Sequence, residues 1–218
     1  RTQLDNSLVF RESDLYGNQN GRDIGLWLSG KYSITKGEAK RPILDYTLGV
    51  YNGSGINVAD NNQDKDISAS LGISPIKDLC IFGRFLNGVG RTTVQPTVDA
   101  DRTRFGGNIS YKYKGFLFEG EYLSASDESD SLALLERSGY YITLGYTPIK
   151  DKLQIIARID NYDPNTAAED NITNKYILAT SYFFTKNTRI QLEYNLVLEE
   201  AATQKKNNLF AIQFQAGF

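Results

Sequence analysis

The sequence predicts an all-β fold, a transmembrane antiparallel up-and-down β-barrel, and three observations support this prediction. Apolar and polar side chains alternate along segment after segment, which is the period of a β-strand with one apolar face. Long and short connectors alternate between these segments, as in barrels that have tight turns at one rim and longer loops at the other. No stretch approaches the roughly 18 consecutive apolar residues that a membrane-spanning helix needs.

The carboxy-terminal segment, residues 209–218, shows how the two faces differ. One face is apolar and carries Phe210, Ile212, Phe214, Ala216 and Phe218. The opposite face is mostly polar and includes Gln213 and Gln215. A soluble sandwich would bury the apolar face in a core, whereas a membrane barrel turns it to lipid and encloses water with the polar face. We expect the barrel arrangement, because the alternation continues through the whole chain.

About eleven segments are predicted to be strands, each near the 9 to 11 residues that a tilted membrane strand requires. They span residues 23–32, 44–51, 67–74, 79–86, 104–113, 116–123, 140–146, 153–161, 176–184, 189–198 and 209–218. Residues 189–198 alternate most sharply, with Ile190 and Leu192 against Gln191 and Glu193. The only helical candidate is Leu132–Arg137 (LALLER), for which a short loop helix is expected.

The connectors predict the orientation of the barrel. Long ones are expected at 198–208, 161–175, 124–139, 87–103 and 52–66, a medium one at 33–43, and short ones at 185–188, 147–152, 113–115 and 75–78. The short ones contain Pro, Gly, Lys and Asn, which suit tight turns. Because the short turns of such barrels face the periplasm, the carboxy terminus is predicted to lie on the periplasmic side.

The strand number predicts a missing portion. The first clear strand must run toward the periplasm, whereas a closed bacterial barrel needs an even number of strands with both chain ends in the periplasm. At least one further strand is therefore expected either within residues 1–10 or outside this sequence. An open sheet edge is also not tolerated in lipid. We therefore expect residues 1–218 to be a single transmembrane β-barrel domain, the carboxy-terminal portion of a larger barrel of which eleven or twelve strands are present.

Composition excludes several functional classes. The net charge of −2 argues against nucleic-acid binding, and the absence of His removes the usual base for a Ser or Cys nucleophile. Cys80 is the only cysteine, so no internal disulfide is expected. We expect no catalytic residue, no cofactor and no metal site. The acidic segment Asp60–Asp66 could bind calcium, but it lacks EF-hand spacing, and a solvated turn is the favoured interpretation.

Three stretches resemble the phosphate-selective porin O and P family, particularly its Bacteroidota-type outer-membrane members. They are GRDIGLWLSG at Gly21–Gly30, LGVYNGSGINVADNNQDKD at Leu48–Asp66 and SPIKDL at Ser74–Leu79. The resemblance implies a barrel of about 16 strands in the bacterial outer membrane and transport of small anions such as phosphate. It also implies outer-membrane lipid and lipopolysaccharide as surroundings, and a possible homotrimer or association with other outer-membrane proteins.

Strand phasing predicts which side chains face the lumen. The lumen-facing candidates are Lys31, Arg84, Arg104, Lys112, Glu119, Glu121, Arg158, Asp160, Arg189 and Glu193. A phosphate-selective pore needs a ladder or ring of one sign. The signs are mixed here, so cross-strand ion pairs in the wall are the favoured interpretation.

Two functions follow from the predicted barrel. The first is an outer-membrane porin that lets small hydrophilic solutes diffuse through a polar lumen. The second is a non-conducting scaffold subunit of a larger outer-membrane complex. Ion conductance of the full-length protein in a planar bilayer discriminates the two. A barrel hydrolase is disfavoured because His is absent.

Overall fold

The computed structural model describes residues 23–36, 39–55, 59–60, 62–91, 98–128, 133–200 and 207–217. These residues form eleven β-strands in one sheet, whose order follows the sequence from β1 to β11. The strands are β1 Gly25–Lys36, β2 Ala39–Tyr51, β3 Asp66–Ile73, β4 Leu79–Arg91, β5 Asp99–Tyr113, β6 Phe116–Glu128, β7 Leu134–Ile149, β8 Leu153–Asp163, β9 Thr173–Phe183, β10 Thr188–Glu199 and β11 Leu209–Ala216. Every neighbouring pair is antiparallel. The predicted all-β up-and-down fold is therefore confirmed.

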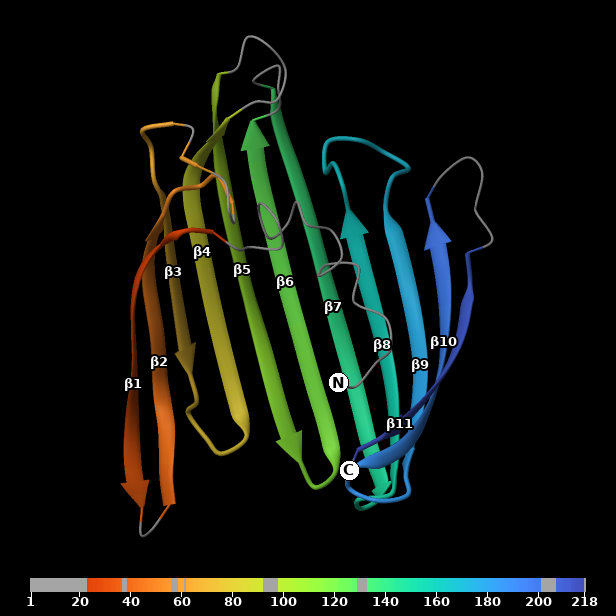
Figure 1. Ribbon diagram of the computed structural model, residues 1–218. Coiled ribbons are helices and arrows are strands. Elements are labelled where there is room, and N and C mark those ends of the chain that lie inside the picture. The colour runs from red at the N-terminus through yellow and green to blue at the C-terminus, as the bar shows by residue number, and fades with distance from the viewer. Residues whose placement is uncertain are drawn as a thin grey trace.

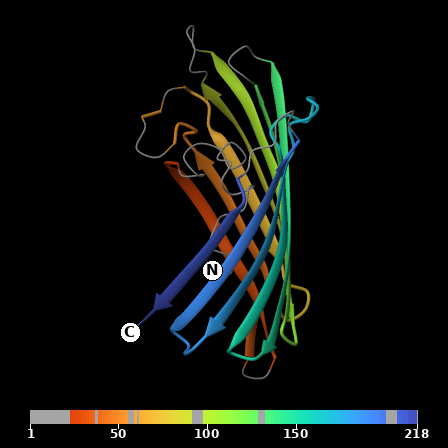
Figure 2. The same cartoon turned by 90° about the vertical axis from the view of Figure 1, so that its right-hand side faces the viewer.

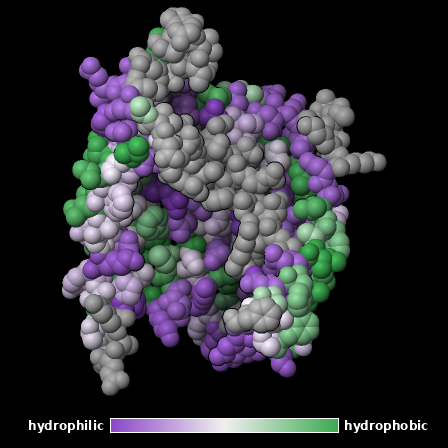
Figure 3. Space-filling view, viewed as in Figure 1, coloured by the Kyte–Doolittle hydropathy of each residue, from purple (hydrophilic) through white to green (hydrophobic). Residues whose placement is uncertain are grey.

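The sheet curves into a trough, with β1 and β11 nearer the viewer than the middle strands in Figure 1, as the turned view in Figure 2 shows. We call the concave side the inner face and the convex side the outer face. In the uncovered part of the hollow, hydrophilic residues are visible with some hydrophobic ones between them, and hydrophobic residues gather along the flanks of the trough (Figure 3). Among the described residues, no helix is long and apolar enough to cross a membrane.

The predicted inversion of faces is seen on β10. Leu192 and Tyr194 are 36% and 46% exposed, whereas Gln191, Glu193 and Asn195 are each only 1% exposed. The apolar side chains therefore point away from the protein, and the polar side chains are enclosed by it. A soluble sandwich would show the opposite arrangement.

The carboxy-terminal strand β11 also turns its apolar side chains outward. Ile212 and Phe214 are 62% and 65% exposed. Gln213 and Gln215 are exposed as well, because β11 is an edge of the described sheet. Phe218 lies outside the described residues.

Short and long connectors alternate as predicted, and the short ones gather at one rim (Figure 1). The β5–β6 connection is a two-residue turn in which Lys114 and Gly115 have φ angles of 45° and 86°. Both positive values are the geometry of a type I′ hairpin turn, which matches the twist of its flanking strands.

Several strands extend beyond the predicted bounds. The expected connector 33–43 is mostly strand, because β1 continues to Lys36 and β2 begins at Ala39. The predicted loops 87–103 and 124–139 are shortened in the same way. The helix expected at Leu132–Arg137 is wrong, since Leu134–Arg137 begins β7. These extensions carry polar residues on both faces, so hydropathy no longer alternates there.

Candidate functional site on the inner wall

A band of polar residues crosses the inner face of the middle strands, and we call the inner face of β4–β9 the inner wall. The register sets Asn108 of β5 opposite Glu121 of β6, and Glu121 opposite Tyr141 of β7. Tyr141 is in turn opposite Asp160 of β8, which is opposite Lys175 of β9. Directly opposed residues have Cβ atoms about 4.5–5.5 Å apart, so side chains from five strands meet in one row.

Two arginines connect this row. Arg84 Nη2 donates to Asn108 Oδ1 at 3.2 Å and lies 3.4 Å from Glu121 Oε1. Arg158 Nε donates to Asp160 Oδ1, and its guanidinium carbon lies 3.7 Å from the centre of the Tyr141 ring. Stacking on an aromatic face and pairing with a carboxylate hold the Arg158 guanidinium in one orientation.

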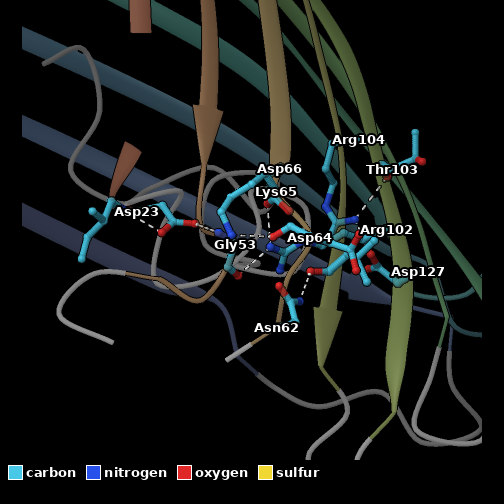
Figure 4. A network of polar contacts seen from close by, with 12 residues as sticks. Asp23, Gly53, Asn62, Asp64, Lys65, Asp66, Arg102, Thr103, Arg104 and Asp127 are labelled. Carbon is cyan, nitrogen blue, oxygen red and sulfur yellow. Dashed lines mark hydrogen bonds and ion pairs between the residues drawn. The ribbon is translucent and has the colours of Figure 1, made fainter. Parts of the chain in front are cut away.

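A second polar cluster lies toward the rim of the long connectors, where Figure 4 shows it from close by. Arg102 Nη2 donates at 2.6 Å both to Asp66 Oδ2 and to the carbonyl oxygen of Gly53. Asp23 Oδ2 accepts from the Gly53 amide at 2.7 Å. One arginine on β5 thus ties the end of β2 to the start of β3. Asp66 is 4% exposed, so its charge depends on Arg102 for a partner.

A third cluster shares one carboxylate between two arginines. Asp127 Oδ2 accepts from Arg137 Nη1 at 2.6 Å, and Asp127 Oδ1 accepts from Arg104 Nη1. Asp127 lies on β6 between the other two residues, which lie on β7 and β5. The cluster therefore ties three neighbouring strands together near the same rim.

Some hydrogen-bonding atoms of the inner face have no partner. Arg158 Nη2, Arg84 Nε, Thr143 Oγ1 and the Asn195 side-chain amide are buried and make no hydrogen bond in the structure. Thr143 is directly opposite Arg158. These unpartnered groups lie beneath the surface of the inner face, where burial without a hydrogen-bond partner is costly.

Each of the ten sequence-predicted candidates has at least one outward apolar or glycine neighbour along its strand, and all ten lie on the inner face. The structure brings Arg84, Glu121, Arg158 and Asp160 together in the row that crosses β5–β9. It does not bring the others there. Arg104 belongs to the third cluster, and Lys31 pairs with Asp45 at 2.9 Å near the β1 edge.

The remaining four candidates lie elsewhere on the inner face. Arg189 donates to Gln215 Oε1 at 3.0 Å, close to the β11 edge. Lys112 is exposed near the short-turn rim, Glu119 is half-buried on β6, and Glu193 is buried on β10.

Strand phasing of the sequence did not predict four charged residues of the inner wall, namely Arg102, Asp127, Arg137 and Lys175. A period of two could have found Arg102, because it lies two positions before Arg104. The strand was expected to begin only at residue 104, and residues 124–139 were expected to be a loop.

No group of three or more His, Cys, Asp or Glu side chains suited to a metal ion occurs among the described residues. In the segment 60–66, Asp60 instead accepts from Lys65 Nζ at 2.5 Å. Asn62 Nδ2 donates to the carbonyl oxygen of Val89 at 2.9 Å. Cys80 is a free, half-buried cysteine.

The fold is similar to that of a solved porin and of a solved outer-membrane protein. An anion-selective porin from Comamonas acidovorans is 15% identical, with a TM-score of 0.64 over 96% of this chain and 64% of that one. OmpT of Vibrio cholerae, an outer-membrane protein solved in a trimer form, is 18% identical, with a TM-score of 0.57 over 86% of this chain and 64% of that one. This chain therefore spans 64% of the length of each of these proteins.

The sequence itself carries the family assignment. No curated protein sequence matches the chain. The model of the Gram-negative porin family, however, matches residues 23–202, which is most of its length. The sheet, its outward apolar face and this match agree, and the chain belongs to the family of Gram-negative porins.

Proposed function

We propose that the chain forms much of the wall of an outer-membrane porin that lets small hydrophilic solutes diffuse passively and favours anions, phosphate among them. On this proposal the ten inner-face candidates line a water-filled lumen and no residue performs covalent chemistry. The short turns and the carboxy terminus face the periplasm. The barrel is completed by further strands and assembles as a homotrimer.

The observation that carries the anion preference is the excess of cations on the inner wall. The cations are Arg84, Arg102, Arg104, Lys112, Arg137, Arg158 and Lys175. The carboxylates are Glu119, Glu121, Asp127 and Asp160, together with Asp66 of β3, which pairs with Arg102. A wall with more fixed cations than carboxylates concentrates anions in a confined lumen.

One comparison supports the anion preference. The structurally similar porin from Comamonas acidovorans is described as anion-selective. The phosphate preference rests only on the resemblance of residues 21–79 to the O and P family, so it is the narrower part of the proposal.

The test is conductance of the full-length protein in a planar bilayer under a KCl gradient. We expect steady ion steps and a reversal potential on the chloride side. Arg158→Gln should move the reversal potential toward the potassium side with little change in step size. Lys152→Gln, in the exposed β7–β8 turn, is the control and should leave the potential unchanged.

Three outcomes would count against the proposal or against one part of it. An absence of ion steps, together with stable co-purification of partner proteins, would favour the scaffold function. A reversal potential on the potassium side would remove the anion preference but keep the pore. Added phosphate should reduce the chloride current if phosphate occupies the inner wall, and an unchanged current would remove phosphate from the proposal.

A further inference from the structure

Two adjoining apolar hollows lie on the outer face, across β5–β10. One has a volume of about 470 Å³, and its lining includes Tyr113, Phe116 and Tyr146. The other has a volume of about 360 Å³ and is lined by residues of β7, β8, β9 and β10. Both are lined by Leu144 and Ala157, so they adjoin along β7 and β8.

The small side chain of Ala157 lines both hollows and connects them. The outward side chains of β8 on either side of it are Ile155 and Ile159, and its cross-strand partners are Leu144 and Leu178. A methyl side chain among four larger aliphatic ones leaves a trough rather than a flat surface. We call the two hollows together the Ala157 groove.

Aromatic rings and a cation mark one end of the Ala157 groove. The rings of Phe116 and Tyr146 stack with their centroids 4.5 Å apart. Lys114 Nζ, in the tight β5–β6 turn, lies 5.2 Å from the centre of the Tyr113 ring. Aromatic girdles of membrane barrels lie at the level of the lipid headgroups, so this end is where a phosphate would meet the Lys114 ammonium.

The length of the groove fits one lipid leaflet. Along β7, the groove extends four residues from Tyr146 to Ile142, which is about 13 Å at a rise of roughly 3.3 Å per residue. Half of a hydrocarbon core about 30 Å thick is close to this length. Because membrane strands are tilted by roughly 35–45°, the groove descends about 10 Å from the aromatic girdle and stays within one leaflet.

We propose that the Ala157 groove binds one acyl chain of a glycerophospholipid whose anionic phosphate lies beside Lys114. The inference rests on the proposed membrane location of this sheet. Within lipid there is no hydrophobic driving force for contact, so retention depends on close packing, which a trough provides and a flat face does not. The charge of Lys114 at the mouth favours an anionic lipid over a second copy of the protein.

The test is native mass spectrometry of the detergent-solubilised full-length protein with limiting dioleoylphosphatidylglycerol. The wild type should retain one lipid. Ala157→Leu fills the trough and should weaken retention at least tenfold. Ala69→Leu is the matched control, because Ala69 is an outward alanine on β3 away from the groove, and it should retain lipid as the wild type does. Far-UV circular dichroism confirms that each variant is folded.

A second pair of variants tests the headgroup contact. Lys114→Gln should abolish the preference for phosphatidylglycerol over phosphatidylcholine without releasing the chain. Lys77→Gln, in the exposed β3–β4 turn, should keep that preference.

Three outcomes would overturn the proposal. They are equal retention by wild type and Ala157→Leu, equal loss in Ala69→Leu, and dissociation of a protein oligomer by Ala157→Leu with no change in bound lipid. Ion conductance of Ala157→Leu should match the wild type, so failure of the lipid site can be distinguished from failure of the porin function.

Discussion

The outer and inner faces of the same strands are held in place by different means. On β9, the outward Tyr176 and Leu178 are 40% and 60% exposed. On β4–β7, the inner face is a series of ion pairs and hydrogen bonds between neighbouring strands. The outer face therefore depends on its apolar surroundings, whereas the inner face depends on particular partners. Substitutions of matched size on the two faces should separate these two modes of stabilisation.

The largest effect is expected from removing a partner on the inner face. Arg102→Leu leaves the carboxylate of Asp66, which is 4% exposed, without its cation. A buried charge that loses its partner costs about 3–5 kcal/mol in the free energy of unfolding. Urea unfolding of the full-length protein in lipid vesicles measures this loss.

The exposed Lys31–Asp45 pair provides the control for that experiment. Lys31→Leu should destabilise far less, because solvent screens a pair whose lysine side chain is 71% exposed. The double variant Asp66→Asn, Arg102→Leu should recover part of the stability. If Arg102→Leu unfolds at the same urea concentration as the wild type, the inner face does not depend on its partners.

A smaller effect is expected from adding a charge to the outer face. Leu178 lies in the middle of β9, so Leu178→Arg places a cation near the centre of the hydrocarbon and should cost about 2–4 kcal/mol. Gln154→Arg, on the inner face of β8, should stay within about 0.5 kcal/mol of the wild type. The same urea titration compares the two. Equal costs would show that the outer face is not in contact with lipid.

The smallest effect is expected from one added methyl group on β4. A Cβ on Gly88 would lie 1.8 Å from Asp66 Oδ1 and 3.0 Å from the Asp66 Cα, so Gly88→Ala should cost about 1–3 kcal/mol. A Cβ on Gly83 would have no atom within 4 Å, so Gly83→Ala should be neutral to within about 0.5 kcal/mol. Thermal melting in vesicles distinguishes the two, and an equal shift in both would contradict the crowding at Gly88.

The sequence was enough to predict the fold wherever one face of a strand meets an apolar environment. Residues 189–198 carried the clearest alternation, and β10 spans Thr188–Glu199. Residues 79–86 were hard to phase because Phe82 and Leu86 share the inner face with Arg84, and side chains can pack there without contacting lipid. On residues 176–184 the structure shows Ile177 and Ala179 buried on the inner face. Hydropathy cannot distinguish these apolar inner residues from outward ones.

The candidate site was only partly predictable for a different reason. Alternation fixes the face of a side chain, which is why all ten candidates fall on one side of the sheet. It does not fix the register between strands, and the register decides that Glu121 meets Tyr141 while Arg189 lies near the β11 edge. Arg102 and Arg137 were missed because the strands extend beyond the apolar band, where polar residues occupy both faces.

The strict two-residue repeat restricts how the length of this chain can vary between related genes. Loss of a single codon within β10 would move every following side chain of that strand to the opposite face, exchanging the environments of Glu193 and Tyr194. Insertions in the segment between β10 and β11, by contrast, leave both strands in register with their neighbours. Length polymorphism should therefore be confined to the rim of the long connectors, and that rim is where an inserted epitope or affinity peptide would leave the sheet intact.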